Sequence, residues 1–168
     1  KPLGWSSGGE EFVVMSLTST EHWSVSSINI ERSSRIERFS LPTTDLLRNA
    51  WLSPSGAYIL LDVIRGQEAL LVLSTLDGRQ QSKIASVGVG LFATPLPFAA
   101  VWSPDGQRIL INQPSTGQTA TTWKTYELKG AAGLPINLGV IDPNHYLRPL
   151  AWSPDGAWLA CQVAPGGG

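Results

Sequence analysis

The sequence has little of what metal sites, disulfides and membrane spans require. Its 168 residues include one cysteine, Cys161, and two histidines, His22 and His145. A single cysteine excludes an intrachain disulfide, and so few Cys and His residues do not make a zinc-binding pattern. The longest apolar runs, such as 69–73, fall well below the ~20 residues of a membrane-spanning helix. We therefore expect no metal, no cofactor and no membrane span.

Charge is also scarce, and neither sign is in excess. Charged residues make up 15% of the chain, apolar residues 42%, and the formal net charge is −1. Without a basic excess there is little electrostatic attraction to phosphates, so we expect no nucleic-acid partner. The stretch Lys1–Gly4 has no signal-peptide pattern. The low charge density, together with abundant Ser, Thr and Trp, favours an extracytoplasmic location, although the compartment stays open.

One short stretch, GWSSGGEEFVV (4–14), contains the G-x-S-x-G pattern of a hydrolase nucleophile. A nucleophile elbow needs a buried strand before the serine, a helix after it, and an acid and a histidine elsewhere. Only three residues precede Gly4, and residues 10–17 read as a strand. We therefore do not expect Ser6 to be catalytic.

A four-fold repeat gives this stretch a different meaning. Three segments align directly: AWLSPSGAYILLDV (50–63), AVWSPDGQRILINQ (100–113) and LAWSPDGAWLACQV (150–163). The opening stretch is a fourth copy, in which Ser6 occupies the place of Ser103 and Ser153. The glycines Gly56, Gly106 and Gly156 are 50 residues apart each time. Repeats of about 50 residues are typical of stacked structural units. The repeated structural positions are Trp5, Trp51, Trp102 and Trp152, with Gly9, Gly56, Gly106 and Gly156.

Turn chemistry explains the repeated letters. Pro104 fixes φ at the first turn position, Asp105 can accept a hydrogen bond from the backbone ahead, and Gly106 tolerates positive φ. A strand precedes each such turn and an alternating apolar strand follows it, so each copy predicts a β-hairpin. The repeated tryptophan is expected to pack on a neighbouring sheet.

Each repeat has room for four strands, and no segment has a sustained 3.6-residue apolar period. In the second repeat the expected strands are 47–52, 57–64, 69–75 and 81–86. Four antiparallel strands per repeat predict an all-β protein made of β-propeller blades. A sandwich or a parallel β-helix fits the repeat length less well. We expect one domain, 1–168, with blade units at about 4–46, 47–97, 98–146 and 147–168, the last incomplete.

The W-S-P-D-G element carries a family resemblance. Followed by an apolar strand, Trp102–Gly106 and Trp152–Gly156 resemble the WD-like repeat of TolB-type β-propellers. The element is also similar to repeats in the propellers of the prolyl oligopeptidase and tricorn protease groups. The other copies depart from it, since Ser55 replaces the aspartate and Ser7-Gly8 replaces Pro-Asp. The resemblance implies about three and a half blades, either part of a longer propeller, which we favour, or a chain whose copies associate through open blade edges.

Function is expected at the face formed by the inter-blade connections, such as 42–49 and 142–149, by analogy with other propellers. These connections hold the candidate partner-binding residues Asp45, Arg48, Asp142, Asn144, His145 and Arg148. His145 and Arg148 would contact an anionic or peptide partner. Alternatively, Asp142 and Asn144 cap turns and Arg148 forms an ordinary surface pair.

Three functions stay open at this point. The first is a non-catalytic scaffold that binds a protein, peptide or other ligand, because no nucleophile, base and acid assemble in the sequence. The second is the regulatory propeller of a larger serine hydrolase of the prolyl oligopeptidase type, with its catalytic domain outside this chain. The third, least supported, is a propeller enzyme that uses Asp45, Asp142 and His145.

Overall fold

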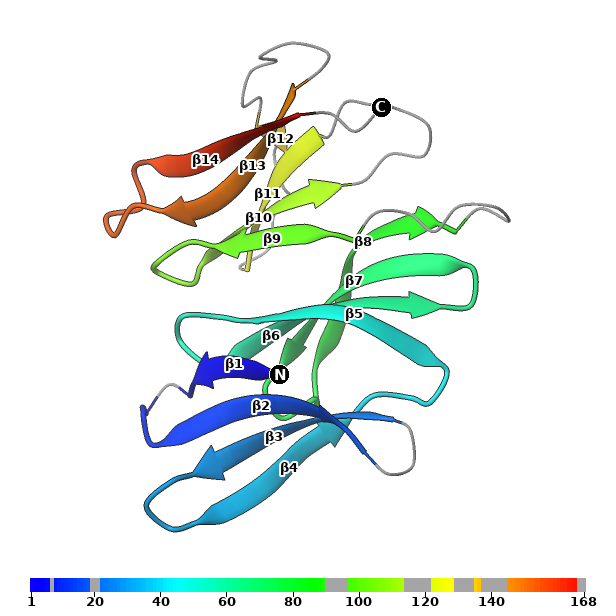
Figure 1. Cartoon of the computed structure of the whole chain (residues 1–168), viewed down its shortest axis with the longest axis vertical. Coiled ribbons are helices and arrows are strands. Elements are labelled where there is room, and N and C mark those ends of the chain that lie inside the picture. The colour runs from blue at the N-terminus through cyan, green and yellow to red at the C-terminus, as the bar shows by residue number, and fades with distance from the viewer. Residues whose placement is uncertain are drawn as a thin grey trace. The chain divides into compact units, whose positions relative to one another are not determined.

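The protein is an all-β chain in the part that the structure describes. The computed structural model describes residues 1–6, 8–18, 22–89, 97–113, 122–128, 135–136 and 145–165. These residues contain strands and turns and no helix, as predicted (Figure 1). The chain divides into two compact units, Lys1–Val89 and Gly90–Gly168.

The first unit contains two four-stranded antiparallel sheets. In each sheet the strands lie side by side in the order in which they occur in the sequence. The first sheet comprises β1 (Pro2–Trp5), β2 (Glu11–Leu17), β3 (Trp23–Asn29) and β4 (Ser34–Ser40). The second comprises β5 (Asp45–Leu52), β6 (Tyr58–Arg65), β7 (Glu68–Thr75) and β8 (Gln81–Gly88). These strands confirm the four-stranded repeat that the sequence predicts.

The core of the first unit lies between its two sheets, which face each other in Figure 1. Alternate residues of β2 and β6 point into this core, as the two-residue period of a strand requires. Each fully buried aliphatic side chain contributes about 1.5–3 kcal/mol relative to an exposed one. The buried members include Val13, Met15, Val25, Ile59, Leu61, Val63 and Leu70.

In its described residues, the second unit contains one four-stranded sheet and one two-stranded sheet. The four-stranded sheet comprises β9 (Ala99–Trp102), β10 (Arg108–Gln113), β11 (Thr122–Glu127) and β12 (Pro135–Ile136). The two-stranded sheet pairs β13 (His145–Trp152) with β14 (Leu159–Pro165). Within the described residues, β14 thus has one neighbour, whereas β2, β6 and β10 each have two.

The repeated glycines end the first turn of every sheet in the same backbone conformation. Gly9, Gly56, Gly106 and Gly156 have φ between 66° and 70°. This left-handed region favours glycine over residues with a Cβ. The positive φ expected from the sequence is therefore confirmed in all four copies.

The serine and aspartate of the turn form a closed set of hydrogen bonds. The Ser103 hydroxyl donates to Asp105 Oδ1 and accepts the Arg108 N–H at 2.9 Å. Asp105 Oδ1 also accepts the Gln107 N–H at 3.0 Å. Ser153 and Asp155 make the same bonds. The serine in these two turns thus has the structural role predicted for it.

Ser6 lies in the corresponding hairpin of the first sheet. Its N–H donates to the Glu11 carbonyl at 2.8 Å, and its carbonyl accepts the Gly9 N–H at 2.9 Å. Ser103 makes the same two backbone bonds in its own turn. Strand β2 follows Ser6, where a nucleophile elbow would have a helix.

Candidate functional site

Asp45 belongs to strand β5 and not to an inter-blade loop, which corrects the expectation for 42–49. Asp45 pairs in register with Arg65 at the end of β6. Arg65 Nε donates to Asp45 Oδ1 at 2.8 Å and Nη2 donates to Oδ2 at 2.6 Å. This two-point contact joins the start of β5 to the end of β6, and the hydrogen bonds that Arg65 donates to Asp45 raise the pKa of Arg65.

Arg48 also lies on β5, beside a bulge between Leu47 and Asn49. Its Nη2 and Nε donate to Asp62 Oδ1 at 2.6 and 3.0 Å. The Asp62 side chain is completely buried and that of Arg48 is nearly so. A buried carboxylate needs a paired cation, so Arg48 serves a structural pair within the sheet.

The other predicted face residues belong to the second unit. Asp142 and Asn144 lie outside the described residues. His145 and Arg148 lie on β13, opposite Pro165 and Gln162 of β14, and not in the loop expected at 142–149. The role of these four residues in partner binding stays a prediction.

The structure reveals a different candidate site in the first unit. It is an open groove at the end of the sheets where the β5–β6 and β7–β8 turns lie. Its volume is about 590 Å³. The first sheet contributes residues near its first turn and from β4, and the second sheet contributes both of its turns at this end. The lining residues are Ser6, Glu11, Arg38, Gly56, Ala57, Thr75, Leu76, Asp77, Arg79 and Gln80.

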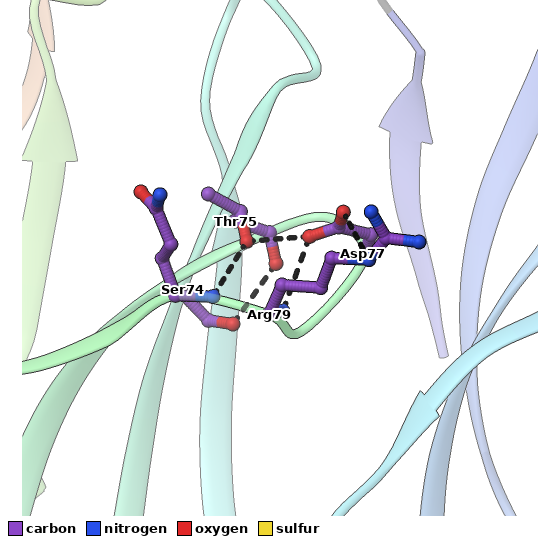
Figure 2. Close-up of polar contacts among 5 residues, drawn as sticks. Ser74, Thr75, Asp77 and Arg79 are labelled. Carbon is purple, nitrogen blue, oxygen red and sulfur yellow. Dashed lines mark hydrogen bonds and ion pairs between the residues drawn. The ribbon is translucent and has the colours of Figure 1, made fainter.

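The turn between β7 and β8 forms one wall of this groove and is fixed by its own hydrogen bonds (Figure 2). The Thr75 hydroxyl donates to Asp77 Oδ1 at 2.6 Å and accepts the Gln80 N–H at 3.1 Å. Asp77 Oδ1 also accepts the Arg79 N–H at 3.1 Å. These bonds match those of the Ser103 turn one for one, so T-L-D-G repeats the S-P-D-G geometry at a second hairpin.

Asp77 is held as an anion by this turn. The Thr75 hydroxyl and, next, the Arg79 N–H lower the pKa of the Asp77 carboxyl from its ordinary value. Arg79 Nε lies 3.4 Å from Asp77 Oδ2, and the Arg79 side chain is 86% exposed. The groove therefore has a cation at its edge that is only loosely held by its neighbour.

The opposite wall carries a second pair of charges. Arg38 on β4 makes an ion pair with Glu11 on β2 and donates through Nε to Ser27 at 2.8 Å. The guanidinium is thus fixed by two partners from its own sheet. Opposite charges line both walls, which is an arrangement suited to polar recognition.

The approach of the two sheets at the groove depends on Gly78. Gly78 has φ of 72°, and a Cβ there would lie 2.6 Å from Phe39 Cβ. A side chain at this position would push the β7–β8 turn away from β4. Glycine is therefore required both for the turn and for the contact that closes one side of the groove.

The groove residues offer binding groups and no assembled catalytic set. The lining includes neither His nor Cys. Among the residues that the structure describes, no three His, Cys, Asp or Glu side chains gather as metal ligands. No described helix is long and apolar enough to cross a membrane.

The expected strands 69–75 and 81–86 predict a turn at 76–80, but the sequence did not predict the groove beside it. A signal was present, because Thr75-Leu76-Asp77-Gly78 has the spacing of Ser103-Pro104-Asp105-Gly106. That match predicts the turn geometry. It does not identify which residue of the other sheet lies against it.

Comparison with known proteins supports the fold and nothing finer. No protein-family model matches the sequence, and no characterised protein matches it. The structure is similar to TolB from Acinetobacter baumannii, with a TM-score of 0.68 and 16% identity over 100% of this chain and 38% of that one. It is similar to a prolyl endopeptidase, with a TM-score of 0.68 and 17% identity over 98% of this chain and 26% of that one.

A third similar structure is itself a propeller domain. The β-propeller domain of the Trilobed protease from Pyrococcus furiosus has a TM-score of 0.58 and 13% identity, over 99% of this chain and 50% of that one. The chain therefore spans half or less of the length of these three proteins. The repeated four-stranded sheets, the shared turn geometry and these likenesses together show that the chain has a TolB-type β-propeller fold.

Proposed function

We propose that this chain is a non-catalytic binding module of a β-propeller and that its groove takes a peptide segment of a protein partner. The observation that carries the proposal is the open groove between two blades, lined by Glu11, Arg38, Asp77 and Arg79. Alternating charges and exposed turn backbone suit an extended peptide, whose polar groups need partners of both signs. The single-domain organisation with blade units at 4–46, 47–97, 98–146 and 147–168 is part of this proposal.

Arg79 favours an acidic peptide over a basic one. Arg38 is fixed by Glu11 and Ser27, whereas Arg79 has one long contact to Asp77 and is largely exposed. A ligand carboxylate can therefore draw Arg79 toward itself without breaking a buried pair. Charge-assisted contacts of this kind are about twice as strong as neutral hydrogen bonds.

The test is an NMR titration of the ¹⁵N-labelled chain with three capped hexapeptides of Glu, Lys, or mixed Gly and Ser. The glutamate peptide is expected to shift the amides of Arg79 and Gln80 and to bind more weakly as salt rises. Arg79→Ala should weaken binding about tenfold, a change of about 1.4 kcal/mol. Arg32→Ala is the matched control, because Arg32 is an exposed arginine outside the groove.

Two results would contradict the groove assignment. One is the absence of shifts with every peptide. The other is a set of shifts at Asp45 and Arg65, at the far end of β5 and β6. That second result would support the inter-blade face predicted from the sequence.

A second candidate function is the regulatory propeller of a larger serine hydrolase. The likeness to a prolyl endopeptidase, of which this chain spans 26%, favours it. The test is an antibody against this chain, used to isolate the native polypeptide for labelling with a fluorophosphonate probe. A labelled polypeptide much larger than 18.0 kDa would support this function, and an unlabelled one would exclude it.

A further inference from the structure

Three hairpin turns of this chain contain the dipeptide Asp-Gly, at 77–78, 105–106 and 155–156. In a flexible peptide this dipeptide isomerises readily, because glycine has no side chain to hinder attack on the preceding aspartate. The glycine nitrogen bonds to the aspartate Cγ, the carboxyl OH and the amide proton leave as water, and a succinimide ring forms. Water then opens the ring at either carbonyl and gives aspartate or isoaspartate, so the net change is an isomerisation without oxidant or reductant.

Isomerisation would damage each of these turns, because isoaspartate carries the main chain through its own side-chain carbons. The main chain gains one carbon atom, and the hydrogen bonds that close the hairpin lose their spacing. At Asp77 the damage would reach the candidate groove, since Asp77 and Arg79 both line it. Contacts that oppose formation of the succinimide ring therefore preserve both the turns and the groove.

The glycine nitrogen, which would make the attack, is engaged in all three turns. The Gly78 N–H donates to the Thr75 carbonyl, and the Gly106 N–H donates to the Ser103 carbonyl, both at 2.9 Å. The Gly156 N–H makes the same bond in its own turn. The amide must give up this proton when the ring forms, so a bond that holds the proton opposes the reaction.

The aspartate carboxyl, which would be attacked, is engaged as well, by a hydroxyl two residues earlier. Asp105 Oδ1 accepts the Ser103 hydroxyl and a main-chain N–H at 3.0 Å. Asp77 Oδ1 accepts the Thr75 hydroxyl at 2.6 Å and the Arg79 N–H at 3.1 Å (Figure 2). Closing the ring pulls Cγ onto the glycine nitrogen and draws Oδ1 away from both donors, so these bonds also oppose the reaction.

The same hydroxyls keep the carboxyls ionised, which slows ring closure further. The reactive form is the protonated carboxyl, because one of its oxygens must leave as water. The Ser103 hydroxyl and, next, the Gln107 N–H lower the pKa of the Asp105 carboxyl. The Thr75 hydroxyl is likewise the largest cause that lowers the pKa of Asp77.

We propose that the hydroxyls of Thr75, Ser103 and Ser153 protect the Asp-Gly bonds of their turns from isomerisation. Each hydroxyl acts by holding the aspartate carboxyl in the turn as a hydrogen-bonded anion. The Ser153 turn repeats the bonds of the Ser103 turn, with Asp155 Oδ1 accepting both the hydroxyl and a main-chain N–H. The hydroxyl thus has a chemical role besides shaping the hairpin.

The test is storage of the folded chain near neutral pH at body temperature, followed by peptide mapping. Arg79 and Arg108 separate the three Asp-Gly sequences into different tryptic peptides. Mass spectrometry after labelling with an isoaspartate-specific methyltransferase therefore follows each site by itself. In the wild type, each site is expected to isomerise at least about tenfold more slowly than the same sequence in a synthetic peptide, the effect of one hydrogen bond to a charged group.

Removing one hydroxyl should release one site. Thr75→Val is expected to raise the rate at Asp77 about tenfold and to leave the rates at Asp105 and Asp155 unchanged. Ser103→Ala should have the same effect at Asp105 alone. Thr75→Ser keeps the hydroxyl and is the matched control, with the wild-type rate at every site. Because unfolding of the chain would raise all three rates together, a rise at one site assigns the effect to its own hydroxyl.

The first turn of the second sheet allows the converse experiment. It has Ser55 in the aspartate position, yet Gly56 keeps a φ of 68° and the Ser53 hydroxyl accepts the Tyr58 N–H at 3.1 Å. The turn geometry is therefore present without an aspartate. Ser55→Asp should create a fourth Asp-Gly that isomerises as slowly as the three natural ones, and adding Ser53→Ala should release it.

Three results would overturn the proposal. The first is a folded wild type that isomerises as fast as the synthetic peptides. The second is an unchanged rate at Asp77 in Thr75→Val and at Asp105 in Ser103→Ala. The third is an equal rise at all three sites in both variants, which would show that the fold as a whole, and not the hydroxyl of each turn, protects these bonds.

Discussion

Gly78 and Phe39 are so close that a methyl group on Gly78 would lie 2.6 Å from Phe39 Cβ. The two residues belong to different sheets of the first unit, and their contact brings the β7–β8 turn against β4. The shape of the candidate groove follows from this contact, because Asp77 and Arg79 flank Gly78 on either side. A change at one glycine therefore affects both stability and the groove.

Gly78→Ala is predicted to destabilise the protein by more than the cost of its backbone conformation alone. A left-handed residue with a Cβ costs about 1–2 kcal/mol, and the clash with Phe39 adds to that cost. Gly66→Ala is the control, because Gly66 also has positive φ but nothing lies within 4 Å of its Cβ position. Urea denaturation of both variants measures the difference. Equal losses of stability would show that the contact with Phe39 adds no cost.

Arg48→Met is predicted to lower the free energy of unfolding by about 3–5 kcal/mol, because it leaves the Asp62 carboxylate buried without its cation. The double variant Arg48→Met/Asp62→Leu should recover much of this loss. Arg79→Met, which breaks the exposed pair with Asp77, should cost much less than Arg48→Met. A small loss in Arg48→Met would mean that Asp62 is satisfied without Arg48.

Ser103→Ala is predicted to cost about 1–3 kcal/mol, because it removes the acceptor of the partly buried Arg108 N–H and the donor to Asp105. Ser6→Ala should leave both stability and any hydrolytic activity unchanged, since the described bonds of Ser6 in its turn are made by its backbone. Thermal unfolding and an esterase assay measure these effects. Loss of hydrolysis in the Ser6 variant would restore the nucleophile interpretation.

Asp105 is predicted to make stability depend on pH in the acid range. The Ser103 hydroxyl and, next, the Gln107 N–H lower the pKa of Asp105 in the folded state. The unfolded state therefore binds the proton of Asp105 more tightly than the folded state does. The stabilisation that ionised Asp105 gives to the fold is present above the unfolded pKa of about 3.9, and it is lost as pH falls through the folded pKa. In Asp105→Asn, the urea midpoint should fall less steeply than in the wild type as pH drops below about 3.9. An unchanged profile would show that Asp105 does not contribute.

The hairpins could be predicted from the sequence because their causes are local. Proline, aspartate and glycine within a few residues of each other specify the turn at Ser103–Arg108, and alternation in 108–113 specifies the strand after it. The positive φ at Gly106 and the hydrogen bonds of Asp105 followed from the same residues.

The candidate site could not be predicted in the same way because its causes are distant in the sequence. The sequence predicts Asp45 in a loop, but Asp45 pairs with Arg65 of the next strand, and this pairing extends β5 to include it. The groove depends on Gly78 lying against Phe39 of another sheet. Periodicity predicts which side of a strand is buried, but it does not identify the residue that lies opposite.

The strictly sequential strand order within each sheet determines how this chain folds. In every described sheet, each strand after the first pairs with the strand before it in the sequence, and the S-P-D-G and T-L-D-G turns complete their hydrogen bonds within six residues. Contacts of such short sequence separation form quickly, since little loop entropy is lost before they are made. Each sheet can therefore form its own strand pairs early, before the core between neighbouring sheets is packed. A gene that gains or loses such a sheet therefore changes the number of cores between neighbouring sheets but leaves the strand pairing within each remaining sheet intact.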